Sequence, residues 1–289
     1  MWKTCGGSSV TDPTPLPGLT PLLGAFSGEV SVAFGRLDKP ESYTHRATDT
    51  MPSASLIKLP ILLAALGGVA RGELSLDERV PLQTGDQVGG TGVLKALQPG
   101  FEPTLKDLLT LMIIVSDNTA TNMVIGRVGQ GAVNTFCQQH GFSDTALVGK
   151  LQLPESELND AQRRGERNRT CAADTLGLLM GLARGDLLPP PETELALSIL
   201  KQQGFTEALA RYLPTDPDLD APYVEVASKS GCLRGVWHDA GIVLQDGNPL
   251  YALVVMTHGS TDERFHPDQE GVLLIAEVSR RAYEHVTQT

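Results

Sequence analysis

The chain has 289 residues, of which 41% are apolar and 20% are charged, so it is long enough to bury a substantial core. Asp and Glu number 34 against 23 Lys and Arg, which gives a formal net charge of −11. An acidic protein repels phosphate, and this argues against a nucleic-acid partner. No apolar run reaches the roughly 18 residues of a membrane span.

The N-terminal segment has no signal-peptide pattern, and the cysteines form no recognised metal-binding motif. Residues 1–17 are rich in Gly, Ser, Thr and Pro and lack the ~7–15-residue apolar region of a signal peptide. We expect either an intracellular protein or an exported one from which a targeting segment was removed. The four cysteines, Cys5, Cys137, Cys171 and Cys232, form no C-x-x-C pair, and no H-E-x-x-H motif is present. We therefore expect inert thiols and no metal site.

Apolar periodicity divides the chain into strands, a helical block, strands and a final helix. Strands are predicted at 28–37 and 42–50. Helical spacing follows at 55–68, 104–127 (with a break near 116–118), 132–139 and 171–184. Segments rich in β-forming residues return at 224–228, 240–244 and 251–257, and an amphipathic helix is predicted over 267–286.

The two groups of strands are expected to pair in space, because neither would make a stable sheet alone. This predicts an α/β (α+β) fold with an antiparallel sheet flanked by N- and C-terminal helices and with an inserted all-α domain. The predicted parts are a tail and first helix region over 1–25, a discontinuous sheet domain over 26–53 and 201–289, and the all-α domain over 54–200. Within that domain, the polar segment 153–169 is expected to be a functional loop.

The first chemical motif is Ser55-Leu56-Ile57-Lys58, an S-x-x-K sequence at the start of a predicted helix. Residues three apart lie on one face of a helix, so the lysine amine can approach the serine hydroxyl. The unpaired N–H groups of the first turn favour developing negative charge. The motif thus offers a nucleophile, a base and part of an oxyanion site. Taken alone, it is common by chance.

The second motif is Ser116-Asp117-Asn118, in the break of the helical pattern. A serine there can pass a proton, and an asparagine can bind an amide. The same tripeptide also suits an ordinary helix cap or turn.

The third motif, Lys229-Ser230-Gly231, falls at the end of a predicted strand. A lysine and a serine suit a carboxylate, and a glycine lets a substrate approach the strand closely. An exposed strand edge with a solvated lysine is the alternative interpretation.

In this order and on these predicted elements, the three motifs resemble those of the serine β-lactamases and penicillin-binding proteins. Their spacing resembles that of the class A β-lactamases, and the similarity extends over about residues 26–288. The polar loop adds Glu155-Ser156-Glu157-Leu158-Asn159, which is similar to the E-x-E-L-N stretch of the class A omega loop.

The resemblance implies a serine acyl-enzyme mechanism. Ser55 would attack the lactam carbonyl, with its proton removed by Lys58 or by Glu155 through a water. Ser116 would pass a proton to the leaving nitrogen. Glu155 would then activate the deacylating water, and Asn159 would position it.

The remaining implied roles concern substrate binding. Backbone N–H groups of Ser55 and Cys232 would bind the oxyanion. Asn118 would hold the acyl side-chain amide, and Lys229 and Ser230 would bind the substrate carboxylate. A small-molecule β-lactam is therefore the implied partner, for an expected monomer that needs no metal or cofactor.

Several positions depart from the family pattern. The carboxylate-binding arginine of the family is replaced by Trp237, and Arg234, three residues earlier, is the candidate substitute. The ion pair that braces the omega loop is replaced by Leu153 and Asn168, which predicts a more mobile loop and a less precisely placed Glu155.

Two further segments have expected places near the site. Residues 89–92 (Gly-Gly-Thr-Gly) are expected to line an open wall of the cleft. His238 and Asp239 are adjacent on a strand, so they should point to opposite faces, and we expect His238 to be structural.

Three functions are therefore compared. The leading one is a class A-like serine β-lactamase. The second is a DD-peptidase or esterase of the same superfamily, suggested by Trp237 and by the missing ion pair. The third is a penicillin-binding module that is acylated once without turnover.

Overall fold

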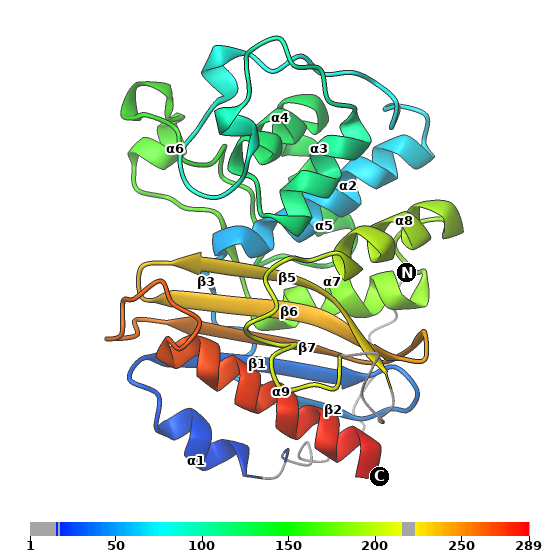
Figure 1. The fold of residues 1–289 in the computed structure, drawn as a ribbon, viewed down its shortest axis with the longest axis vertical. Coiled ribbons are helices and arrows are strands. Elements are labelled where there is room, and N and C mark those ends of the chain that lie inside the picture. The colour runs from blue at the N-terminus through cyan, green and yellow to red at the C-terminus, as the bar shows by residue number, and fades with distance from the viewer. Residues whose placement is uncertain (1–15, 17, 216–222, 289) are drawn as a thin grey trace.

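A computed structural model describes residue 16, residues 18–215 and residues 223–288. Its central element is a five-stranded antiparallel sheet with the strand order β2-β1-β7-β6-β5 (Figure 1). The strands are β1 Glu29–Arg36, β2 Ser42–His45, β5 Val224–Leu233, β6 Val236–Gln245 and β7 Asn248–His258. The N-terminal and C-terminal strand groups therefore pair through β1 and β7, as the sequence predicts.

The described residues also form nine α-helices. They are α1 Leu19–Gly24, α2 Lys58–Ala70, α3 Leu105–Ile114, α4 Asn118–Val128, α5 Gln130–Gln139, α6 Asp160–Arg163, α7 Ala172–Arg184, α8 Pro190–Lys201 and α9 Glu270–Gln288. Short 3-10 turns are η1 Ala54–Ile57, η2 Thr84–Asp86, η3 Leu94–Ala96 and η4 Glu155–Glu157. A second, two-stranded sheet pairs β3 Met51–Pro52 with β4 Arg169–Thr170.

Both faces of the large sheet are buried, and β7 shows how the sequence achieves this. Residues 251–256 read Tyr-Ala-Leu-Val-Val-Met, and all six are fully buried. Successive side chains on a strand point to opposite faces. The even-numbered residues pack in a core shared with α2 and α7, and the odd-numbered ones pack in a second core beneath α9. Helix α9 crosses one face of the sheet in Figure 1, and α7 contacts the other face.

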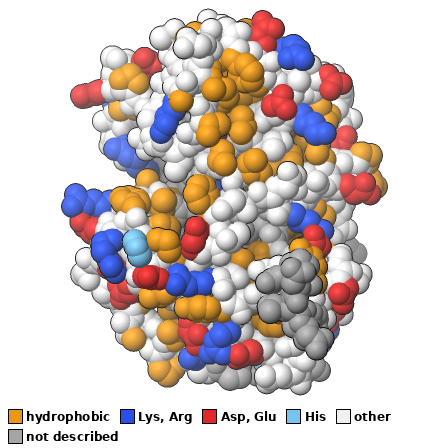
Figure 2. Space-filling view, in the orientation of Figure 1, with side chains coloured by type: hydrophobic (Ala, Val, Ile, Leu, Met, Phe, Trp, Pro, Cys, Tyr) orange, Lys and Arg blue, Asp and Glu red, His pale blue; other side chains and the backbone are white. Residues whose placement is uncertain are grey.

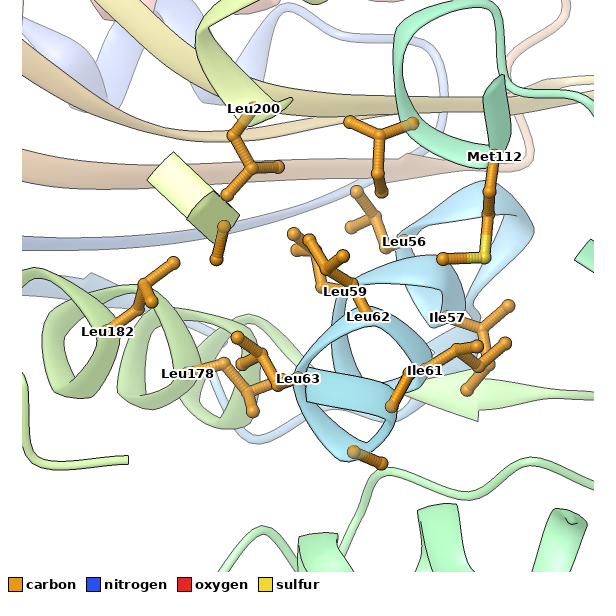
Figure 3. Close-up of a cluster of buried hydrophobic side chains, with 14 of the residues drawn as sticks. Leu56, Ile57, Leu59, Ile61, Leu62, Leu63, Met112, Leu178, Leu182 and Leu200 are labelled. Atoms are coloured by element: carbon orange, nitrogen blue, oxygen red, sulfur yellow. The ribbon is translucent and has the colours of Figure 1, made fainter. Parts of the chain in front are cut away.

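Helix α2 is the central element of the helical part. It is apolar on every side, and Lys58 to Gly68 are all buried, which is typical of a helix enclosed by other helices. Figure 3 shows Leu63 of α2 facing Leu178 of α7. Truncation of such a leucine to alanine typically costs about 2–5 kcal/mol of stability. This packing holds the first residues of α2 rigidly at the junction between the helices and the sheet.

The structure differs from the sequence predictions mainly at element ends. The predicted strand 42–50 ends at His45, because Arg46 adopts a left-handed φ of 48° and forms an ion pair with Asp49. Helix α8 was not predicted; it begins at the Pro190 that follows two leucines and Pro189. The final helix begins at Glu270 instead of 267. None of the described helices is both long enough and apolar enough to cross a bilayer.

Candidate active site

Ser55 lies in η1, directly before α2, where the helical part meets the sheet. The residue before it, Ala54, has a left-handed φ of 45°, and Ser116 has a φ of 53°. These conformations cost of order 1–3 kcal/mol each for a residue with a side chain, and they are concentrated at functional sites. The two strained residues flank the same small group of side chains.

Lys58 connects the first and second motifs. Its Nζ donates to the backbone oxygen of Ser116 at 2.7 Å and to Asn118 Oδ1 at 2.9 Å, and it lies 3.0 Å from Ser116 Oγ. Ser116 Oγ in turn lies 3.0 Å from Ser55 Oγ. The structure therefore brings Ser55, Lys58, Ser116 and Asn118 together in one hydrogen-bonded chain.

The environment of Lys58 favours its neutral form. The side chain is fully buried, and this burial lowers the pKa of the ammonium well below its usual value. The positive charge of Lys229 lowers it further, while Asp117 opposes the shift. A lysine with a lowered pKa gives up its proton more readily, and the resulting neutral amine can accept a proton, which an ammonium cannot do.

The loop of the second motif is held by Asp117. Its carboxylate accepts hydrogen bonds from the backbone N–H groups of Val93 at 2.6 Å, Leu94 at 2.8 Å and Ala120 at 2.9 Å, the last as the N-cap of α4. Thr91 Oγ1 donates to the Ser116 carbonyl at 2.7 Å. The strained Ser116 is thus supported from both sides, and Gly90 and Thr91 line the cavity, as predicted for this wall.

The third motif approaches Ser55 along β5. A Cβ built on Gly231 would lie 2.7 Å from the backbone nitrogen of Ser55, so only glycine fits at this position. Ser230, Gly231 and Cys232 line the cavity, and Lys229 lies fully buried beneath them. Burial lowers the pKa of Lys229 to about 8, and Asp239 opposes this shift.

A cavity of about 980 Å³ opens over these groups. It lies between the helical part and the sheet, and the space-filling view is hollowed at the left edge between those two parts (Figure 2). Eight of the residues predicted for the site line it: Ser55, Ser116, Asn118, Ser230, Gly231, Cys232, Arg234 and Trp237.

The two loop residues of the prediction lie elsewhere. Glu155 is exposed in η4, and neither Glu155 nor Asn159 is among the residues that line the cavity. Asn159 Oδ1 accepts from Gln162 N at 2.9 Å as the N-cap of α6, and its Nδ2 donates to Val148 O at 2.8 Å. The loop residues that line the cavity are Leu153, Leu158, Gln162, Arg167 and Asn168. Among the described residues, Asn159 bonds to Val148 and Gln162, and neither Glu155 nor Asn159 joins the hydrogen-bonded chain of Ser55, Lys58 and Ser116.

The base of the loop is braced differently from the prediction. Asn168 Oδ1 accepts from the N–H groups of Val148 at 2.7 Å and Gly149 at 3.1 Å, and its Nδ2 donates to Gly149 O. Its carbonyl accepts from Ser53 N at 2.9 Å. The neutral side-chain amide of Asn168 thus ties the end of the loop to residues 148–149, and its backbone carbonyl ties the loop to Ser53, without an ion pair.

The remaining predicted positions fall on the sheet side. Arg234 is paired with Glu263 at 2.6 Å, and its side chain is 78% exposed. His238 is buried with its Nε2 2.9 Å from Pro52 O, while Asp239 accepts from Leu209 N at 3.1 Å. The two adjacent residues therefore have separate partners, and His238 has the structural surroundings that were expected for it.

Two cavity-lining aromatic residues carried no signal in the sequence. Phe205 and Phe265 lie in irregular segments far from each motif, yet both line the cavity. The sequence gives no periodicity there from which their positions could be inferred.

One group of possible metal ligands exists among the described residues: Asp144, Cys171 and Asp174 at the start of α7. Asp174 Oδ2 already accepts from Asp144 N and from Thr145 Oγ1, both at 2.9 Å. Burial raises the pKa of the Cys171 thiol to about 11, so a thiolate ligand is disfavoured there. This cluster fits a helix start better than a metal site.

Comparisons of sequence and of structure both find beta-lactamases among the proteins similar to this chain. Residues 18–286 match the family described as the Beta-lactamase enzyme family. A beta-lactamase of Rhodobacter capsulatus is 28% identical over 232 residues, which are 80% of this chain and 75% of that protein. A beta-lactamase structure from Sphaerobacter thermophilus DSM 20745 has a TM-score of 0.83 at 27% identity, covering 95% of this chain and 99% of that one. The structure of PBP-A has a TM-score of 0.81 at 26% identity, covering 95% and 96%.

Proposed function

The chain belongs to the Beta-lactamase enzyme family, and from this premise we propose that it hydrolyses β-lactams through an acyl-enzyme on Ser55. The observation that carries the proposal is the chain Lys58 Nζ–Ser116 Oγ–Ser55 Oγ, with both distances at 3.0 Å and with Lys58 fully buried. This arrangement supplies a nucleophile together with a route for its proton.

Acylation follows from the hydrogen-bond pattern of a neutral Lys58. A neutral amine has two N–H donors and one lone pair. The donors match Ser116 O and Asn118 Oδ1, and the lone pair can accept from Ser116 Oγ. Ser55 Oγ then bonds to the lactam carbonyl carbon as its proton moves to Ser116 and the Ser116 proton moves to Lys58. When the C–N bond breaks, the reverse transfer through Ser116 protonates the ring nitrogen.

The β5 backbone and Lys229 complete substrate binding in this proposal. Gly231 is close to the Ser55 nitrogen, which supports an oxyanion site formed by the N–H groups of Ser55 and Cys232. Each such donor is typically worth about 2.7–4 kcal/mol. Ser230 faces the cavity above the buried Lys229, and this supports a carboxylate site with the lysine as its cation.

Release of the product requires a base that activates water. We assign this step to Glu155, with Asn159 as the positioning residue. This assignment requires the exposed turn 155–157 to move toward the cavity and the Asn159 side chain to leave Gln162 N and Val148 O. A second candidate function is supported by the observed position of Glu155 outside the cavity lining, and by the similarity to PBP-A. It is a penicillin-binding protein that forms the same adduct and releases it slowly.

The test is a time course of intact mass with a penicillin and with a chromogenic cephalosporin. We expect an adduct on the unsubstituted protein that disappears as substrate is hydrolysed over many turnovers. The variant Ser55→Ala should show neither adduct nor turnover. Persistence of the adduct after one equivalent would favour the second candidate, and turnover by Ser55→Ala at the unsubstituted rate would overturn the proposal.

A further inference from the structure

We propose that Trp237 and Phe265 form an aromatic wall that binds an aromatic substituent next to the substrate carboxylate. This inference rests on the proposed function and names the substrate class: bicyclic β-lactams, such as cephalosporins, in which the carbon next to the carboxylate-bearing carbon carries a substituent that contains an aromatic ring.

The sheet register places the Trp237 side chain on the same face of the sheet as Ser230, which belongs to the proposed carboxylate site. Trp237 of β6 lies directly opposite Cys232 of β5, and opposed residues of an antiparallel pair point to the same face. Ser230 is two residues from Cys232 on β5, so it also points to that face. The indole therefore stands beside the proposed carboxylate site, and it lines the cavity.

The backbone of Trp237 is held firmly. Its N–H donates to Thr257 Oγ1 at 3.1 Å, and Thr257 Oγ1 donates back to the Trp237 carbonyl at 2.8 Å. A Cβ built on Gly271 of α9 would lie 3.2 Å from Trp237 Cβ, so the strand packs closely against the start of that helix. A wall fixed in this way can contact a ligand at little cost in conformational entropy.

Phe265 provides the second ring. Its centroid lies 6.3 Å from that of Trp237, with the planes tilted by 51°, and the residue is 66% exposed. The loop that carries it is anchored on both sides of Phe265, because Asp262 Oδ2 accepts from Glu270 N at the start of α9 and Arg211 donates to Pro267 O. An exposed aromatic ring on an anchored loop at a cavity rim has apolar surface to bury against a ligand.

Most of the nearby lining residues are apolar: Phe205, Ala208, Leu233, Pro267 and Val272, with Glu207 and His266 as the polar exceptions. Arg234, which also lines the cavity, is already paired with Glu263 and is directed largely into solvent. This side of the cavity therefore offers hydrophobic contact to the group beside the carboxylate.

The experiment compares two cephalosporins that share one acyl side chain and differ only next to the carboxylate, where one carries an aryl-vinyl group and the other a methyl group. The rate constant for acylation of Ser55 is measured by intact mass at limiting substrate. The wall predicts that Trp237→Ala lowers the aryl-to-methyl ratio of these constants roughly tenfold, the scale of a lost aromatic pair. Trp237→Phe should retain most of the ratio.

Phe265→Ala tests the wall without a risk to folding, since this side chain is largely exposed, and it should lower the ratio severalfold. The matched control is Phe101→Ala, an exposed phenylalanine outside the cavity, which should leave the ratio unchanged. Unchanged ratios in both Trp237→Ala and Phe265→Ala would overturn the wall. Failure of both compounds to acylate the unsubstituted protein would instead overturn the proposed function.

Discussion

Two regions around the cavity differ in how firmly they are built. At the junction of η1, α4 and β5, the functional groups are buried and mutually hydrogen-bonded, as Lys58 shows with its contacts to Ser116 and Asn118. In the loop 153–169, Glu155 is exposed, and the regular structure is limited to the short turn η4 and the four-residue helix α6. A buried polar group loses stability unless it is hydrogen-bonded, and several such bonds together restrict the position of its side chain. An exposed carboxylate can hydrogen-bond to water instead, so its position is not restricted in this way.

Acylation and deacylation therefore depend on different kinds of structure in this proposal. The groups proposed for acylation are already in place, whereas the carboxylate proposed for deacylation must still be brought to the cavity. Substitutions in the two regions should consequently affect different steps.

The largest effect is expected for Lys58→Met, which removes the buried amine from the rigid region. Loss of a general base typically costs 10²–10⁴-fold, so we expect the acylation rate to fall by roughly this factor. Stopped-flow measurement with a chromogenic cephalosporin gives the rate, and thermal unfolding of the variant checks its fold. An acylation rate within twofold of the unsubstituted protein would show that the amine is not the base.

A smaller but more discriminating effect is expected in the loop. Glu155→Gln should slow release of the adduct by roughly 10²-fold while leaving acylation within about twofold, because only the second step needs this carboxylate. Glu157→Gln is the matched control, since it removes an exposed carboxylate from the same turn. Equal release rates in the two variants would exclude the proposed role of Glu155 and leave slow, unassisted release as the explanation.

The smallest effect is a pH dependence of substrate binding. Burial lowers the pKa of Lys229 to about 8, so its ammonium form predominates below that pH and is lost as the pH rises through it. We expect KM for a carboxylate-bearing lactam to increase between pH 7 and pH 9, and we expect a substrate methyl ester to show no such increase. A pH-independent KM for the free acid would argue against Lys229 as the cation of the carboxylate site.

Sequence patterns predicted the succession of strands, a helical block, strands and a final helix, although not α8 or the small sheet of β3 and β4. They also identified the three motifs around Ser55, Ser116 and Gly231 that line the cavity. Apolar periodicity specifies elements such as α2 and β7, because burial requires it. The three-residue spacing predicted that Ser55 and Lys58 lie near each other. The observed connection between them runs through Ser116 Oγ.

The positions of the exposed and irregular segments follow from tertiary contacts that sequence patterns do not reveal. Glu155 and Asn159 match a sequence pattern, but the cap of α6 and the contact with Val148 orient Asn159 instead. Phe205 and Phe265 reach the cavity through loops whose paths depend on distant anchors such as Asp239 and Arg211. Local sequence does not encode such anchors, because the two partners lie far apart along the chain and meet only after folding.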